Sequence, residues 1–323
     1  MDVGAGAVPV TKLRYVVMTF SIVLFSLALG IALGGGPLQG PIRGALQSQV
    51  EAVTGANGRE LAALKREKHD LETSAAYDRQ FAEEVSPDLL GTALSDQTVV
   101  VLSLPGVPDP VTESVAGDVE TAGGSVTTTL RVGRELVDPT ARPLVDELSK
   151  RLLDDDLDDV DVPEDASVYT RVGVVASRAL LTTADESDPM DDSARSVFNT
   201  FTTAGLLTGD EPEQRASTAI VLLPEKAGPS ATSGGRSTIL TELVAAMDGA
   251  SRGVVVGGPR SAAEAQGLLA AVRSSAATAE TVSTVDSTWQ RGGQVVTVLA
   301  LAREVAGTTG HYGTGDGADS LLP

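Results

Sequence analysis

A run of uncharged, mostly apolar residues stands near the start of the chain. It extends from Tyr15 to Leu33 (YVVMTFSIVLFSLALGIAL), and Lys12 and Arg14 precede it. A membrane-spanning helix needs about 20 such residues, and basic flanks favour the cytoplasm. The pattern therefore predicts a transmembrane helix at residues 15–34, a cytoplasmic segment at 1–14, and most of the chain on the extracytoplasmic side. The alternative is a cleaved signal peptide, although the run is longer than the roughly 7–15 residues of a signal core.

Small residues recur within this run at four-residue intervals, at Ser26, Gly30 and Gly34. Such a face lets two membrane helices approach closely, and it predicts helix packing within the membrane. The alternative is that small residues are simply frequent in membrane helices.

A second helical pattern follows a break rich in glycine and proline (GGGPLQGP, residues 34–41). Apolar residues recur there at intervals of three and four, with one stutter near Asn57, and charges of both signs fill the other positions. The stripe consists of Leu46, Val50, Val53, Asn57, Leu61, Leu64, Lys68 and Leu71. This spacing favours a coiled-coil stalk at residues 42–86 that pairs with a partner helix in a homo- or hetero-oligomer. The alternative is a helix that packs on its own domain.

Beyond residue 95 the pattern alternates between strands and helices. Continuous apolar runs predict buried strands at Thr98–Leu104 and Thr218–Leu223, and further strands are expected at Ser125–Val132, Gly253–Val256 and Thr281–Val285. Helices are expected at Pro110–Ala122, Pro139–Leu153, Thr238–Met247, Ala262–Ser274 and Gln294–Val305. The fold class is therefore α/β with a largely parallel sheet over residues 95–323. Two strand–helix–strand units suggest a weak internal duplication, with halves at 95–160 and 215–323 joined by a helical stretch.

Composition narrows the functional classes. The net charge of −20 opposes binding to nucleic acid. The chain has no cysteine, which excludes disulfides, thiolate metal sites and cysteine nucleophiles. The four methionines and two histidines form no cluster suited to copper(I). The acidic run DDDLDDVD (154–161) lacks the glycine and distal glutamate of a calcium loop, and it is expected to be a solvated linker. No cofactor is expected, and nothing in the pattern indicates an enzyme.

The C-terminal segment is the most unusual part of the sequence. It reads GTTGHYGTGDGADSLLP, and its glycines permit backbone angles that hold His311 and Tyr312 in one place. The segment is either a cap over the edge of the sheet or a loop that binds a ligand or partner. His311 is the one weak candidate for a metal ligand.

Several of these motifs together resemble the actinobacterial copper transporter family, which includes the SteB-type septation proteins. They are the anchor end LALGIALGGGPL, the stalk, FTTAGLL (Phe201–Leu207), STVD (Ser283–Asp286), GGQVVTVLAL (Gly292–Leu301) and GHYGTGDGADSLLP (Gly310–Pro323). The family motif residues carried over to this chain are Asp286, Gly310, His311, Tyr312 and Gly313.

The resemblance implies copper efflux or copper homeostasis at the cell envelope, and copper enters only by that implication. The SteB branch implies a different role, in which the stalk pairs with a SteA-like membrane partner to control cell-wall hydrolysis at septation. The residues themselves favour this second role, that of a non-catalytic scaffold, because a single membrane helix cannot form a pore without associating with others. The expected location is the plasma membrane, with the mycolate outer membrane as the alternative.

Overall fold

The computed structural model describes residues 10–34, 39–155, 157, 160–163, 165–184, 188–225 and 230–323. By its internal contacts the chain divides into two compact units, Met1–Ser74 and Ala75–Pro323.

Two helices, α1 (Val10–Gly34) and α2 (Gln39–Leu90), account for the described part of the first unit, and α2 continues into the second. The predicted membrane run lies within α1, where the large apolar side chains from Tyr15 to Leu29 are exposed. None of the helices, over the residues that the structure describes, combines the length and hydropathy needed to cross a membrane. The transmembrane assignment therefore stays a prediction.

The predicted stalk lies within α2. This helix begins at Gln39, a few residues before the predicted start, and ends at Leu90, with Pro87 in its last turn. Leu61, Leu64 and Leu71 are more than half exposed. The side chains of Leu46, Val50, Val53 and Asn57 lie outside the described part of the helix, and coiled-coil pairing stays a prediction.

The second unit is built around a seven-stranded sheet in the order β4-β2-β1-β6-β7-β8-β9. All neighbouring pairs are parallel except β2 with β4. The α/β class and the largely parallel sheet are thus confirmed. The strands of this sheet are β1 (Thr98–Ser103), β2 (Ser125–Val132), β4 (Leu207–Thr208), β6 (Thr218–Leu222), β7 (Val254–Gly257), β8 (Ser283–Val285) and β9 (His311–Tyr312). A separate antiparallel pair joins β3 (Asp188–Pro189) to β5 (Gln214–Arg215).

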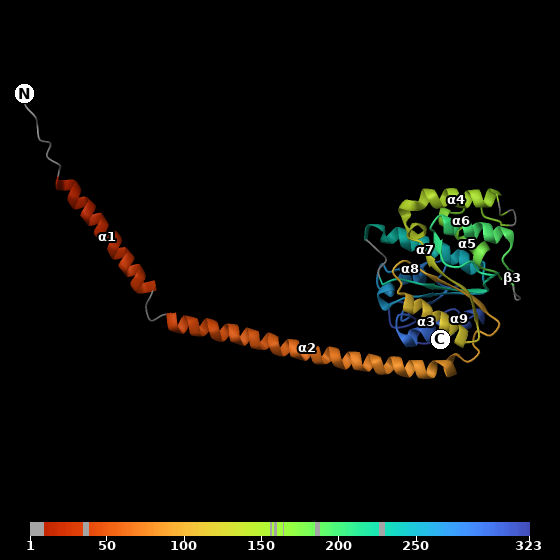
Figure 1. Ribbon diagram of the computed structural model, residues 1–323, viewed down its shortest axis with the longest axis horizontal. Helices are drawn as coiled ribbons and strands as arrows, with labels where there is room; N and C mark the ends of the chain where they lie inside the picture. The colour runs from red at the N-terminus through yellow and green to blue at the C-terminus, as the bar shows by residue number, and fades with distance from the viewer. Residues whose placement is uncertain are drawn as a thin grey trace, which may run out of the picture. The chain divides into compact units, whose positions relative to one another are not determined.

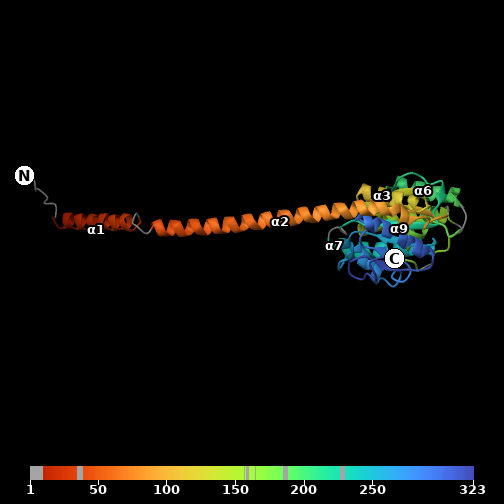
Figure 2. The same ribbon diagram turned by 90° about the horizontal axis from the view of Figure 1, so that it is seen from below.

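Helices cover both faces of the sheet (Figure 1). The helices are α3 (Asp109–Thr121), α4 (Arg142–Asp155), α5 (Val168–Leu180), α6 (Asp192–Thr203), α7 (Ser230–Gly249), α8 (Leu268–Ser274) and α9 (Arg291–Val305), with 3₁₀ turns η1 (Arg134–Val137), η2 (Pro139–Ala141) and η3 (Arg260–Ala263). One hydrophobic core lies between the sheet and the layer of α4 to α8. A second core lies under α3 and α9, which Figure 2 shows from their own side.

The two strand–helix–strand units recur on opposite faces. The crossover helix α3 joins β1 to β2, and α7 joins β6 to β7. Since β2 and β7 lie on opposite sides of the central β1–β6 pair, right-handed crossovers place α3 and α7 on opposite faces. The strand order therefore reverses between β1 and β6. In open parallel sheets, ligands bind beside such a reversal.

Three parts of the observed fold differ from the sequence prediction. The expected helix Ala262–Ser274 is split into η3 and α8 by a turn in which Gln266 has a positive φ of 69° and Gly267 is extended, with φ −72° and ψ 158°. The helical stretch between the halves is two helices, α5 and α6. The two-residue strands β3, β4, β5 and β9 were not predicted.

Candidate functional site

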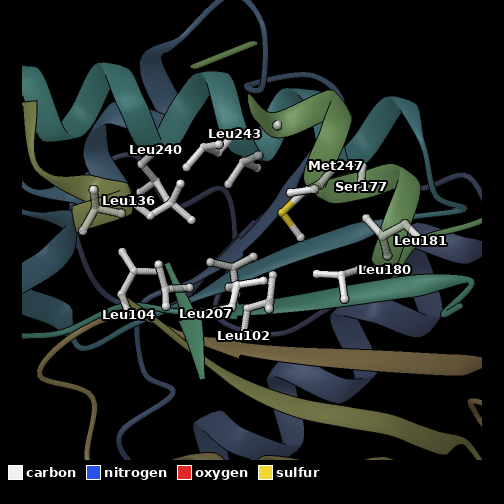
Figure 3. Close-up of a pocket in the computed structure, with 16 residues that line it drawn as sticks. Leu102, Leu104, Leu136, Ser177, Leu180, Leu181, Leu207, Leu240, Leu243 and Met247 are labelled. Carbon is white, nitrogen blue, oxygen red and sulfur yellow. The ribbon is translucent and has the colours of Figure 1, made fainter. Parts of the chain in front are cut away.

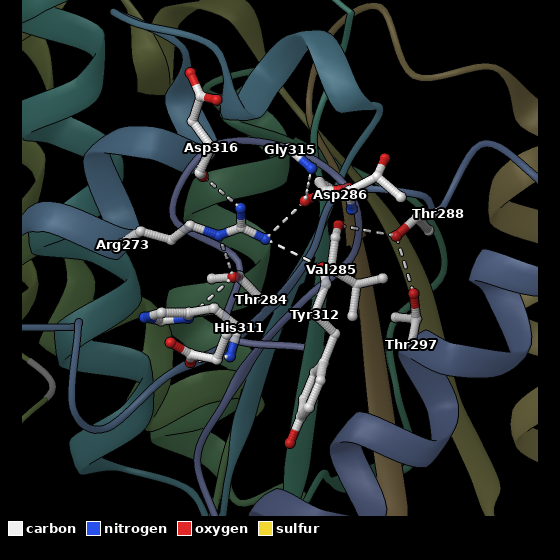
Figure 4. A network of polar contacts seen from close by, with 12 residues as sticks. Arg273, Thr284, Val285, Asp286, Thr288, Thr297, His311, Tyr312, Gly315 and Asp316 are labelled. Carbon is white, nitrogen blue, oxygen red and sulfur yellow. Dashed lines mark hydrogen bonds and ion pairs between the residues drawn. The ribbon is translucent and has the colours of Figure 1, made fainter. Parts of the chain in front are cut away.

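Asp286, which directly follows β8, is the centre of a buried polar cluster at one end of the sheet (Figure 4). Its Oδ1 accepts a hydrogen bond from the Thr314 amide at 2.8 Å, and its Oδ2 accepts one from the Gly315 amide at 2.9 Å. Oδ2 also accepts from Nη2 of Arg273 at 3.0 Å. Asp286 has no exposed surface, so its charge depends on these partners for compensation.

Arg273 of α8 supplies the opposite charge, and its side chain is only 4% exposed. Nε donates to Thr284 Oγ1 at 2.8 Å, Nη1 donates to the Asp316 carbonyl at 2.8 Å, and Nη2 also donates to the Tyr312 carbonyl at 3.1 Å. Burial lowers the pKa of Arg273, and the adjacent Asp286 acts in the opposite direction. The guanidinium thus connects α8, β8 and the C-terminal tail.

His311 and Tyr312 form β9, which pairs in parallel with β8. His311 Nδ1 lies 3.0 Å from Thr284 Oγ1. Because Arg273 already donates to that oxygen, the Thr284 hydroxyl proton is directed to Nδ1, which makes His311 Nδ1 an acceptor. Burial, together with the nearby Arg273 cation, lowers the pKa of His311. The imidazole is therefore neutral at pH 7.

Gly310 and Gly313 of the tail lie so close to neighbouring atoms that no larger residue fits. Gly313 has φ +131°, and a β-carbon there would lie 2.1 Å from Asp286 Oδ1. A β-carbon on Gly310 would lie 2.5 Å from the Tyr312 hydroxyl oxygen. Beyond β9 the tail turns back, and the Asp319 amide donates to the His311 carbonyl at 2.7 Å. The C-terminal segment thus adds a strand to the sheet and folds back over it, as the cap alternative predicts.

A second buried acid lies at the opposite end of the same strands. Glu304 of α9 accepts hydrogen bonds from the hydroxyls of Ser283 and Thr309, the latter at 2.9 Å. Burial raises the pKa of Glu304, and the nearby Asp248 carboxyl raises it further. Gly253 makes room for this side chain, since a β-carbon there would lie 2.8 Å from Glu304 Cγ.

A smaller hydroxyl pair fixes α9 against the strand ends. Thr288 Oγ1 lies 2.9 Å from Thr297 Oγ1, and Thr297 donates to the Gly293 carbonyl at 2.8 Å. A β-carbon on Gly257, the last residue of β7, would lie 2.6 Å from Thr288 Oγ1. The Thr288 side chain therefore fills the space beside Gly257 at the end of β7.

The structure brings together the five family motif residues that the sequence singled out. Asp286, Gly310, His311, Tyr312 and Gly313 all lie at or beside the β8–β9 pair. Sequence reasoning missed Arg273 and Glu304, because each follows an ordinary helical pattern and finds its partners only in the fold. Two sequence signals pointed to the cluster, the glycine-rich tail and the STVD motif that contains Thr284 and Asp286.

Hydrogen bonds within the fold engage both carboxylate oxygens of Asp286 and all three nitrogens of the Arg273 guanidinium. The cluster therefore acts as a clamp that closes the edge of the sheet. Within the described part of the chain, no group of three or more His, Cys, Asp or Glu side chains is placed to hold a metal ion. His311, the weak metal candidate, uses Nδ1 to bind Thr284 and is 8% exposed.

The other predicted sites lie in the first unit. Ser26 is exposed on α1, whereas the surroundings of Gly30 and Gly34 lie outside the described residues. Leu61, Leu64 and Leu71 form an exposed stripe on α2. Sequence reasoning overlooked Tyr77 and Phe81, which are exposed one helical turn apart on the same helix.

The described residues thus form a largely parallel α/β domain that is closed at one sheet edge by its C-terminal tail and that follows a long helix in the chain. The chain belongs to the family of copper transport outer membrane proteins, MctB, whose family model matches residues 11–323. It is 25% identical over 326 residues to the copper transporter MctB of Mycobacterium tuberculosis (strain H37Rv), covering 96% of this chain and 98% of the relative. The copper transporter MctB of Mycobacterium leprae is 26% identical over 347 residues, with the same coverage.

Proposed function

We propose that this protein acts in copper efflux or copper homeostasis at the cell envelope, as an anchored and non-catalytic protein. The observation that carries the proposal is the family match over residues 11–323, together with relatives named copper transporters that align along almost the whole chain. Copper is the cargo in this proposal, not a resident cofactor.

The proposed anchor is the run from Tyr15 to Leu33, with the N-terminus cytoplasmic and the α/β domain outside. The uncharged sequence and the exposed apolar side chains of α1 support it, because such a surface is stable only against lipid or another apolar partner. The plasma membrane is the proposed location. The family description, which names the outer membrane, favours the mycolate outer membrane as the alternative.

One membrane helix encloses no pathway for an ion, so the proposal requires association with other chains. Two features support association: the small-residue face at Ser26, Gly30 and Gly34, and the exposed stripe at Leu61, Leu64 and Leu71. The α/β domain, closed by its C-terminal clamp, is proposed to be a rigid body that this assembly positions outside the membrane.

The test is deletion of the gene in its own host, with cell-associated copper measured by mass spectrometry and growth measured on graded copper. We expect copper content and copper sensitivity to rise while zinc content stays constant. If the deletion strain keeps the copper content and the copper tolerance of its parent, the proposed copper function is wrong.

A second candidate function is a non-catalytic scaffold, in which α2 pairs with a SteA-like membrane partner to control cell-wall hydrolysis and septation. The exposed leucine stripe on α2 favours it. Crosslinking in intact membranes is expected to capture a membrane protein through residues 44–84, and replacing Leu61, Leu64 and Leu71 with serine is expected to abolish that product. A crosslink that persists in the triple variant counts against this candidate.

A further inference from the structure

Most of the large apolar side chains of the α/β domain are covered within the domain itself. Figure 3 shows this for the space between the sheet and the helices α5 and α7, where Leu102, Leu240 and Met247 are among the lining side chains. They leave a void of only about 50 Å³, which is part of the hydrophobic core. The helix α2 differs from this domain, because its apolar side chains have no such cover.

The described part of α2 is exposed all round over most of its length. None of the residues 60–80 is buried, and Leu61, Leu64 and Leu71 are each more than half exposed. Most helices in proteins draw their stability from the packing of an apolar face rather than from their own hydrogen bonds. The three leucines therefore indicate a partner that packs against α2.

The spacing of these leucines assigns heptad positions to this part of the helix. Leu61 takes position a, Leu64 takes position d, and Leu71 takes the next d. Lys68 takes the a position between Leu64 and Leu71. A single lysine at an a position costs stability, but it specifies the register and the number of paired helices.

The charges beside this apolar seam match a second copy of the same helix. Glu60 takes position g, and Lys65 takes the e position that follows it. In a parallel pair of helices, each g position faces the following e position of the other helix. Glu60 of each copy thus faces Lys65 of the other copy, and the two-fold symmetry of a homodimer forms this attractive pair twice.

The next flanking pair consists of two acids, Glu67 at g and Glu72 at e. Lys68 supplies the charge that compensates them. Within one helix, Lys68 Nζ lies 3.4 Å from Glu72 Oε1. In the parallel pair, the a position also lies next to g of the other helix, so each Lys68 lies beside Glu67 of the second copy. Both lysines of the seam therefore have counter-charges.

The opposite orientation brings like charges together. If an antiparallel pair matches Leu61 of one copy with Leu71 of the other, the two Lys65 side chains become neighbours, and so do the two Glu67 side chains. Two copies that are anchored by the same N-terminal run in one membrane also leave it on the same side. The charges and the proposed anchor thus favour the same parallel orientation.

We propose that residues 60–72 of α2 pair with the same residues of a second copy in a parallel, in-register coiled coil of two helices. Attraction between Glu60 of one copy and Lys65 of the other selects the partner. This proposal rests on the association that the proposed copper function requires, and it identifies the associating chain as a second copy. The anchors confine both segments to one membrane and raise their effective concentration, which stabilises a short seam.

The absence of cysteine from the chain allows a direct test of the pairing. Full-length Leu64→Cys protein is oxidised with diamide in the membranes of the cells that express it. The matched control is Arg66→Cys, at an exposed position that faces away from the seam. We expect Leu64→Cys to give roughly fivefold more disulfide-linked homodimer than the control, because d positions of a parallel pair face each other. Equal yields overturn the proposal.

The orientation is tested with two further cysteine variants in the same membranes. Copies with Leu61→Cys and copies with Leu71→Cys are expressed together and oxidised. We expect little disulfide between them, because the two positions lie far apart along a parallel pair. If they link more efficiently than two Leu64→Cys copies, the parallel orientation is wrong.

Charge exchange between copies tests the selection of the partner. Glu60→Lys alone makes both flanking pairs of a homodimer positive, and Lys65→Glu alone makes both negative. A Glu60→Lys copy that pairs with a Lys65→Glu copy restores two attractive pairs. The two variants, each with Leu64→Cys and a different affinity tag, are expressed together at equal levels, and the linked dimers are sorted by their tags.

Random pairing makes about half of the linked dimers mixed, and we expect a mixed share of roughly three quarters or more at low salt. We expect about 1 M salt to return the share toward one half, because salt screens exposed charges. A mixed share of one half at low salt overturns the proposal.

This proposal and the proposed copper function fail in different ways. If no homodimer forms but deletion of the gene still raises cell copper, the second copy is the wrong partner and the copper function stands. If the homodimer forms as described but deletion leaves cell copper unchanged, the copper function is wrong and the pairing stands.

Discussion

Arg273 of α8 and Asp286 at the end of β8 form a buried ion pair, with Nη2 3.0 Å from Oδ2. The two residues are 13 positions apart, and the tail that covers them comes from the last residues of the chain. This pair therefore ties α8, the sheet and the C-terminus into one unit.

Asp286→Asn is expected to destabilise the α/β domain by about 3–5 kcal/mol, because it leaves the Arg273 charge buried without a counter-charge. Denaturant unfolding followed by circular dichroism measures the change. The control is Asp316→Asn, since Asp316 contacts Arg273 only through its backbone carbonyl. If Asp286→Asn lowers the free energy of unfolding by less than about 1 kcal/mol, the ion pair with Arg273 does not hold the domain together as described.

Gly313→Ala is expected to destabilise the domain by about 1–3 kcal/mol, because the new methyl group collides with Asp286 and the backbone stays at positive φ. Gly292→Ala is the matched control. Gly292 lies in the first turn of α9, and a β-carbon there would meet no atom within 4 Å, so alanine is neutral or stabilising by up to about 1 kcal/mol. Urea midpoints compare the two variants. Equal effects would show that the tail is not clamped against Asp286.

The lowered pKa of His311 predicts a pH dependence of stability. The ordinary pKa of histidine is about 6.5. Just below this pH, His311 binds a proton in the unfolded chain, whereas the buried imidazole of the folded protein stays neutral because its pKa is lower. The free energy of unfolding therefore falls as the pH is lowered through 6.5, and this contribution is absent above that value. The groups around the imidazole are Thr284, Arg273, Asp319 and the backbone of Ala279, and the last two oppose the lowering of the pKa of His311.

Unfolding midpoints between pH 5 and pH 8 test this dependence. His311→Asn is expected to flatten the slope near pH 6, whereas His69→Asn, at an exposed position on α2, leaves it intact. If the unfolding midpoint of His311→Asn changes with pH as steeply as that of the unmodified protein, the imidazole of His311 is not buried in its neutral form.

Strands with continuous apolar runs could be predicted closely from the sequence. Thr98–Ser103 and Thr218–Leu222 are buried on both faces, so every position is apolar or a small hydroxyl. The two-residue strands have no periodicity, and only the fold determines them. In the same way, Arg273 follows an ordinary helical pattern, and its buried role depends on Asp286, Thr284 and the tail.

Copper handling, as proposed, depends on association through α2. The most direct test is complementation of the deletion strain with the unmodified protein, with Leu61→Ser/Leu64→Ser/Leu71→Ser, and with the control Lys65→Ser/Arg66→Ser/Asp70→Ser, which alters other exposed positions of α2. Cell-associated copper is measured at matched protein levels in the membrane fraction. The unmodified protein and the control are expected to restore copper to the parental level, whereas the leucine variant leaves it raised. Full restoration by the leucine variant would contradict a copper function that requires this stripe.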